Sequence, residues 1–142
     1  MPDTTPLDPI AGERFRGFNA ILGFRMTEWR TDFARLEVDI QEQHLNRSGV
    51  IHGGVLATIL DATLGYAGIY PLEEGAPPRR AVTLTLTTTF IGQAKEGTIV
   101  CTAERRGGGR SVFMATGEVR DQAGNLLAIA EGTYRYVNQT PR

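Results

Sequence analysis

The sequence has few of the residues that build metal centres or disulfide frameworks. Its 142 residues include one cysteine and two histidines, which excludes an internal disulfide and a structural zinc site made of these side chains. We therefore expect no metal and no cofactor. Neither sign of charge dominates, because 15 basic and 16 acidic side chains leave a net charge of −1. The composition thus does not indicate nucleic acid or an anionic membrane as a partner.

We expect neither a secretory signal nor a membrane span. The first six residues form neither a basic nor an apolar segment. Residues 48–72 carry Asp61 as their only formal charge, but their glycines and central carboxylate favour a helix buried in a soluble fold. The length suits one domain over residues 1–142, with loose polar ends at 1–8 and 138–142. We expect a cytoplasmic protein.

Apolar periodicity predicts a helix, two strands, a second helix and then four strands. The first helix is expected over residues 9–22, and the second runs from Gly53 to about Tyr70, where Pro71 stops it. The expected strands span residues 24–29, 33–40, 82–90, 98–103, 111–120 and 126–137. Turns at 105–110 and 121–125 favour hairpin pairing of neighbouring strands in the second half. The result is an α+β fold with one antiparallel sheet against one helix.

The second helix predicts self-association, because it is apolar nearly all round. One sheet covers only one side of such a helix. A second copy of the same helix is the simplest cover for the other side, and its alanines and glycines permit close approach. We expect a homodimer at least, and a tetramer built as a dimer of dimers.

Reactive chemistry is concentrated in and before this helix. Asp61 is a carboxylate in apolar surroundings, which is costly unless it is paired or used. A base or nucleophile is the favoured interpretation, and a carboxylate bonded to a hydroxyl or backbone group is the alternative. Gly53 and Gly54 begin the helix, where N–H groups at the positive end of the helix dipole suit an oxyanion. A tight turn that needs glycine is the alternative there.

The loop before the helix completes a specific pattern. Asn46 lies six residues before His52, and the run 46–61, NRSGVIHGGVLATILD, resembles the signature of hotdog-fold acyl-CoA thioesterases of the PaaI-like type. The resemblance continues through residues 81–87, 109–111, 124–128 and 131–133. The hotdog fold, an antiparallel sheet wrapped around a long central helix, agrees with the architecture expected above. His44 lacks the context of the glycines, and we expect it on the surface of the loop.

The resemblance implies a role for each matched residue. Asp61 stands at the position of the catalytic carboxylate, as general base on water or as nucleophile. Gly53 matches the glycine whose backbone N–H polarises the thioester carbonyl. His52 and Asn46 match residues that shape the site near the carbonyl and the attacking water. Thr83 stands, by strand alignment, where relatives carry a serine or threonine that assists this water.

Other residues are candidates for binding an acyl-CoA substrate. Gly54 lets a ligand approach the backbone. Arg110 and Ser111 lie in a turn that resembles the one that meets the pantetheine arm, with a flexible hairpin tip as the alternative. Arg79 and Arg80 begin the segment 79–110, whose six basic and two acidic residues suit the phosphates of CoA. Solvated strand ends are the alternative interpretation of this charge.

Spacing along the helix predicts a shared site. Gly53 and Asp61 are eight residues apart, or about 12 Å along a helix axis. One thioester carbon cannot lie within about 3 Å of both groups, so we expect the carboxylate to come from the partner subunit. Two rival functions stay open: a hydratase or dehydratase for enoyl or 3-hydroxyacyl thioesters, disfavoured because His52 abuts the glycines, and a binding module without turnover, disfavoured by Asp61.

Overall fold

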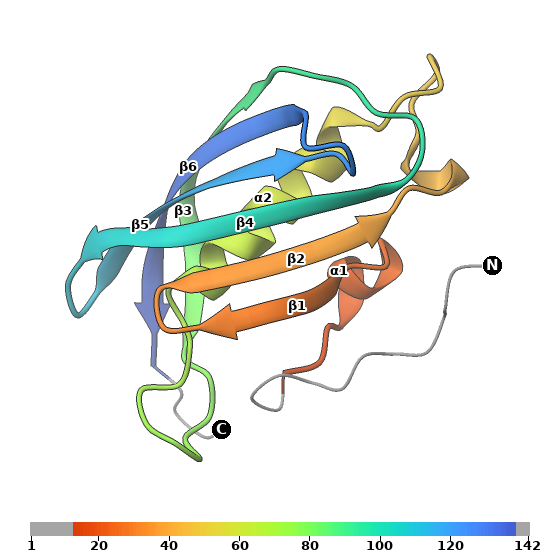
Figure 1. The fold of residues 1–142 in the computed structure, drawn as a ribbon. Helices are drawn as coiled ribbons and strands as arrows, with labels where there is room; N and C mark the ends of the chain where they lie inside the picture. The colour runs from red at the N-terminus through yellow and green to blue at the C-terminus, as the bar shows by residue number, and fades with distance from the viewer. Residues whose placement is uncertain (1–12, 139–142) are drawn as a thin grey trace.

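The structure, a computed structural model, describes residues 13–138. It contains a six-stranded antiparallel sheet with one long helix against one face (Figure 1), which confirms the predicted α+β class. The helical elements are α1 (Gly17–Ile21), the 3-10 turn η1 (Glu42–His44) and α2 (Gly53–Ala67). The strands are β1 (Arg25–Arg30), β2 (Phe33–Asp39), β3 (Arg80–Phe90), β4 (Thr98–Gly108), β5 (Val112–Arg120) and β6 (Leu126–Val137).

The first helix is shorter than predicted where the structure describes it. The predicted leader at 1–8, the first residues of the helix predicted at 9–22, and residues 139–142 of the tail lie outside the described residues. Within them the helix comprises Gly17–Ile21 only, preceded by Arg16 in an extended conformation. Gly17 itself has a φ of +58°, which glycine adopts readily. The chain turns at this glycine, so the helix does not continue through residues 13–16.

The long helix α2 begins where predicted and ends earlier, at Ala67. Side chains of the sheet satisfy carbonyl groups at its end. The indole N–H of Trp29 donates to the carbonyl of Tyr66 at 2.8 Å, and the Tyr136 hydroxyl donates to the carbonyl of Gly68 at 2.7 Å. Such carbonyls lack intrahelical partners, so these bonds stabilise the end of the helix. No helix within residues 13–138 is long and apolar enough to cross a membrane.

The strand order corrects one prediction. The sheet runs β1-β2-β4-β5-β6-β3, so β4, β5 and β6 pair as hairpins but β3 pairs with β6 instead of β4. The connection between β3 and β4 crosses the end of the sheet (Figure 1). Burial explains the order. Ile99, Cys101 and Ala103 of β4 are at most 2% exposed and belong at the centre beside β2, whereas β3 has no buried residue and suits an edge.

The core lies between α2 and the sheet. One stripe of the helix faces it, at the spacing of an amphipathic helix. The buried residues of this stripe are Val55, Leu56, Ile59, Leu60, Thr63, Leu64 and Ala67. Apart from Tyr66, the remaining residues are small or polar and at most partly covered, among them Ala57, Thr58, Asp61 and Ala62. Asp61 therefore lies at the edge of the buried stripe, beside the core residue Tyr134, and the small residues of the outer side permit close approach.

Candidate active site

Asp61 is half-buried, and two hydroxyl groups contact one of its carboxylate oxygens. The Thr83 hydroxyl donates to Oδ1 at 2.8 Å. The Tyr134 hydroxyl lies 3.0 Å from the same oxygen and 3.0 Å from the backbone carbonyl of Asp61. Oδ2 has no hydrogen-bond partner among residues 13–138. The structure thus brings together two of the predicted residues and adds Tyr134, which the sequence did not point to.

Pairing with Tyr134 directs Thr83 toward α2. Thr83 lies opposite Tyr134 in the pairing of β3 with β6, and the register then shifts so that Thr85 lies opposite Thr133. Side chains of cross-strand partners project from the same face of a sheet, and a bulge changes the direction of the side chains beside it. Both hydroxyls consequently point at the helix that covers this face.

The first turn of α2 leaves one N–H group available. His52 precedes the helix, and its Nδ1 accepts a hydrogen bond from the N–H of Gly54 at 2.8 Å. The carbonyl of His52 accepts from Val55 at 2.9 Å and from Leu56 at 3.4 Å. The N–H of Gly53 has no partner in the part of the chain that the structure describes. Gly53, rather than Gly54, is therefore the donor that an oxyanion can reach.

His52 and Asn46 both shape the approach to this helix. Because Nδ1 of His52 is an acceptor, the neutral ring carries its proton on Nε2, and the residue is exposed. The side-chain oxygen of Asn46 accepts from the N–H groups of Ser48 at 2.9 Å and Val50 at 3.3 Å. These bonds fold the loop, and within residues 13–138 the Asn46 amide nitrogen has no partner.

His44 contradicts its predicted place on the surface, since it is only 1% exposed. Its Nδ1 accepts from the N–H of Gln41 at 2.9 Å, so Nε2 carries the proton and donates to the Leu22 carbonyl at 2.7 Å. Its own carbonyl accepts from the N–H of His52 at 2.8 Å. His44 thereby fixes the loop before α2 against the end of α1. The spacing of Gln41 and His44, which forms a capping box, is the signal that could have indicated this role.

The predicted substrate-binding arginines lie around one cleft of about 630 Å³. Its lining includes Arg79, Arg80, Arg110, Ser111, Arg135 and Tyr136. The guanidinium of Arg79 lies over the Tyr136 ring, 3.5 Å from its centroid. No acidic side chain lines the cleft, and none of its four arginines forms an ion pair within residues 13–138. Four unneutralised guanidinium groups in one cleft favour phosphate groups. Arg135 was missed because strand alternation alone does not show which residues neighbour the turn at Arg110.

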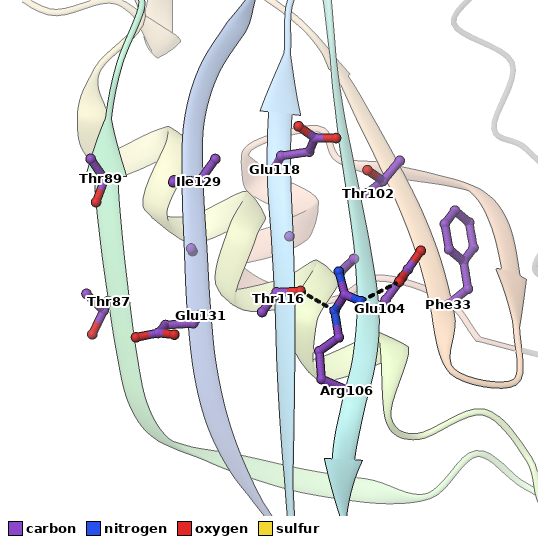
Figure 2. Close-up of a pocket in the computed structure, with 13 residues that line it drawn as sticks. Phe33, Thr87, Thr89, Thr102, Glu104, Arg106, Thr116, Glu118, Ile129 and Glu131 are labelled. Atoms are coloured by element: carbon purple, nitrogen blue, oxygen red, sulfur yellow. Dashed lines mark hydrogen bonds and ion pairs between the residues drawn. The ribbon is translucent and has the colours of Figure 1, made fainter.

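A second hollow, of about 510 Å³, lies on the sheet face turned away from α2. Figure 2 shows side chains from several strands around it, including Thr87, Thr116 and Glu131. Arg106 donates to the Thr116 hydroxyl at 2.7 Å and lies 3.4 Å from Glu104. None of the predicted site residues lines this hollow. The candidate catalytic residues therefore lie on the α2 side of the sheet.

Comparison with known proteins decides the family. The model of the thioesterase superfamily matches residues 48–128, which is more than half of the chain. The chain belongs to the thioesterase superfamily. This membership makes the protein a thioester hydrolase. The matched residues include α2, β3, β4 and β5 and the start of β6.

Individual relatives agree with this assignment. Mouse acyl-coenzyme A thioesterase 13 is 31% identical over 99 residues, which are 69% of this chain and 67% of the mouse protein. The structure of zebrafish thioesterase superfamily member 2 is 29% identical, with a TM-score of 0.72 over 85% of this chain and 87% of that one. The PaaI protein of the Escherichia coli phenylacetic acid degradation operon is 23% identical, with a TM-score of 0.75 over 86% and 85%. These likenesses confirm the predicted hotdog fold of this thioesterase.

Proposed function

We propose that this thioesterase hydrolyses acyl-CoA or aryl-CoA thioesters to the free acid and CoA. The observation that carries the proposal is the combination of an oriented carboxylate, Asp61, with an unpaired N–H at the start of the same helix, Gly53. Hydrolysis of a thioester needs a group that activates water or attacks directly, and a donor for the oxygen that becomes negative. These two groups supply both functions.

The proposed mechanism assigns one step to the Asp61 carboxylate and one to the Gly53 N–H. With Asp61 as general base, the carboxylate takes a proton from water while the water oxygen attacks the thioester carbon. Negative charge passes to the carbonyl oxygen, which accepts a hydrogen bond from the Gly53 N–H. When the tetrahedral intermediate collapses, the C–S bond breaks and the protonated carboxyl returns its proton to the leaving thiolate. With Asp61 as nucleophile, its oxygen bonds to the thioester carbon and the C–S bond breaks, which gives a mixed anhydride and the CoA thiolate. Water then hydrolyses the anhydride to the free acid and the Asp61 carboxylate, and the proton that water loses passes to the thiolate.

A second chain completes the proposed site. Gly53 and Asp61 of one chain are about 12 Å apart along the helix axis, too far for one thioester. β3 is a long edge strand whose Val82 and Leu84 are 48% and 51% exposed, and such an edge is a template for pairing with another chain. We propose a homodimer that joins two such edges and two α2 helices. A tetramer, as a dimer of dimers, would use the outer sheet face in Figure 2.

The proposed substrate spans two regions. The arginine cleft, with Arg79, Arg80, Arg110 and Arg135, would hold the phosphates of CoA. Phe90 borders the helix start, because a Cβ built on Gly53 would lie 3.3 Å from its ring. The ring is 54% exposed and offers an apolar surface to the acyl group. A cytoplasmic location remains the expectation from the sequence.

The test is thiol release from a panel of aryl-CoA and alkyl-CoA substrates. We expect the wild-type protein to release CoA, and Asp61→Asn to lose turnover by about 10²- to 10⁴-fold with its fold and subunit mass unchanged. Asp39→Asn, the same chemical change on β2 at a carboxylate bonded to Thr98 and Arg25, is the matched control and should keep wild-type turnover. Hydration without thiol release would indicate the hydratase, and binding without reaction would indicate the binding module. Either outcome overturns the proposal.

A further inference from the structure

We propose that Tyr134 is a positioning residue for the Asp61 carboxylate, and that Tyr134 and Thr83 together leave Oδ2 as the oxygen that meets water or the thioester. The inference rests on the proposed role of Asp61. It adds Tyr134, a residue of β6, to the proposed active site. It also says which of the two carboxylate oxygens of Asp61 takes part in the reaction.

The Tyr134 side chain is confined on three sides. The residue is 2% exposed, and its ring stacks on that of Phe113 with centroids 5.1 Å apart and planes 12° from parallel. A Cβ added at Gly132 would lie 2.8 Å from the Tyr134 ring, and one added at Gly65 would lie 3.4 Å from it. The Gly132 contact is too close for any side chain. The two glycines and Phe113 therefore form a slot that holds the phenol in one orientation.

The hydroxyl of this confined ring contacts Asp61 twice. It lies 3.0 Å from Oδ1 and 3.0 Å from the carbonyl oxygen of the same residue. A group that holds both atoms restricts rotation of the side chain relative to the helix. Burial first, and then the charge and hydrogen bond of Asp61, raise the pKa of the Tyr134 phenol. The hydroxyl consequently keeps its proton and remains a donor at any pH used for an assay.

The hydroxyl groups of Thr83 and Tyr134 both contact the same carboxylate oxygen of Asp61. Thr83 donates to Oδ1 at 2.8 Å, and Tyr134 is the second donor there. A carboxylate oxygen offers about two lone pairs to donors in its plane. Thr83 takes one of them, and Tyr134 shares its single hydroxyl proton between the other and the Asp61 carbonyl oxygen. Oδ2, without a partner among the described residues, is left to take a proton from water or to attack carbon. A carboxylate fixed in this way needs no reorientation during the reaction.

The test is Tyr134→Phe, which keeps the ring and its stacking and removes only the hydroxyl. We expect kcat for thiol release to fall by about 10- to 100-fold, the effect of a misplaced reacting group, with KM changed by less than about threefold. Loss of a donor to a carboxylate favours its protonated form. The acid limb of the pH–rate profile should therefore move to higher pH.

Tyr66→Phe is the matched control. Tyr66 lies on α2, and its hydroxyl donates to a different carboxylate, that of Glu13, at 2.6 Å. The substitution removes the same kind of bond from the same helix without touching Asp61, so kcat and the pH profile should stay as in the wild type. If Tyr134 were only structural, both variants would lose thermal stability while kcat and the acid limb stayed unchanged, which would overturn the proposal.

A second replacement keeps the test decisive if Tyr134→Phe does not fold. 3-Fluorotyrosine at position 134 retains the ring and hydroxyl, but its hydroxyl is the stronger acid and hence the stronger donor to Oδ1. The acid limb should then move to lower pH, opposite to the phenylalanine variant; an unchanged limb contradicts the proposal. An inactive wild-type protein would instead overturn the proposed function, so the two failures are distinguishable.

Discussion

Gly53→Pro isolates one hydrogen-bond donor with little disturbance of the fold. Gly53 is the first residue of α2, and its N–H takes no part in the bonding of the helix within the described residues. Proline is well tolerated at this first position. The residue before it, His52, has φ −66° and ψ 134°, which is the extended conformation that a following proline requires. The substitution should therefore remove the donor and leave α2 intact.

The expected magnitude comes from the role of the donor. Removing one oxyanion donor typically lowers kcat by about 10²- to 10³-fold, or about 3–4 kcal/mol in the barrier. Gly53→Ala is the control, because it adds the same Cβ, 3.3 Å from the Phe90 ring, but keeps the N–H. Phe90 is exposed and can move aside, so we expect kcat of the alanine variant within about threefold of wild type, less than 1 kcal/mol.

The assay is steady-state thiol release with the best acyl-CoA substrate, and circular dichroism melting checks the fold. Two results would refute the reasoning. If Gly53→Pro folds and keeps wild-type kcat, its N–H does not stabilise the oxyanion. If Gly53→Ala loses as much activity as Gly53→Pro, crowding against Phe90 explains the loss and the N–H does not.

Three further predictions concern binding, reactivity and pH. Arg135→Gln should raise KM about tenfold for acyl-CoA but not for the same acyl group on pantetheine, which lacks the nucleotide phosphates; equal effects would contradict the assignment of the cleft. Burial raises the pKa of the Cys101 thiol to about 12, so a thiol reagent should modify it only after unfolding, and rapid labelling of native protein would contradict this. Hydrogen bonds from Thr98 and Arg25 lower the pKa of Asp39, so its contribution to stability is present above about pH 4 and is lost as pH falls through the lowered value. In Asp39→Asn, the free energy of unfolding measured in urea should fall less steeply as the pH is lowered below about 4. The same pH dependence as in the wild type would count against these bonds.

Local patterns predicted the elements that depend on neighbours in sequence. The start of α2 at Gly53 and the alternation of β2 agree with the structure, because helix caps and strand faces follow from a few adjacent residues. The place of β3 did not follow from its pattern. Alternating threonine and apolar residues fit a central strand and an edge strand equally well, and the burial of β4 against β2 decided between them.

The site residues divide in the same way: local patterns predicted some of them, and the others come together only in the folded chain. The spacing of Gly53 and Asp61 was visible in the sequence, as was Thr83 through the family resemblance. Tyr134 reaches Asp61 across 73 positions of the chain, and no local spacing connects a residue on β6 with one on α2. His44 was misplaced for a related reason, since its burial depends on a carbonyl at the end of α1, that of Leu22.

The most direct test of the shared active site mixes two inactive variants. Asp61→Asn and Gly53→Pro homodimers should each be nearly inactive, because every site in them lacks one group. After subunit exchange, a mixed dimer has one site with both defects and one site with neither. Random exchange makes half of the dimers mixed, so thiol release should recover to about a quarter of the wild-type rate, far above the background of either variant. No recovery, with mixed dimers demonstrated by native mass spectrometry, would contradict a site built from Gly53 of one subunit and Asp61 of its partner.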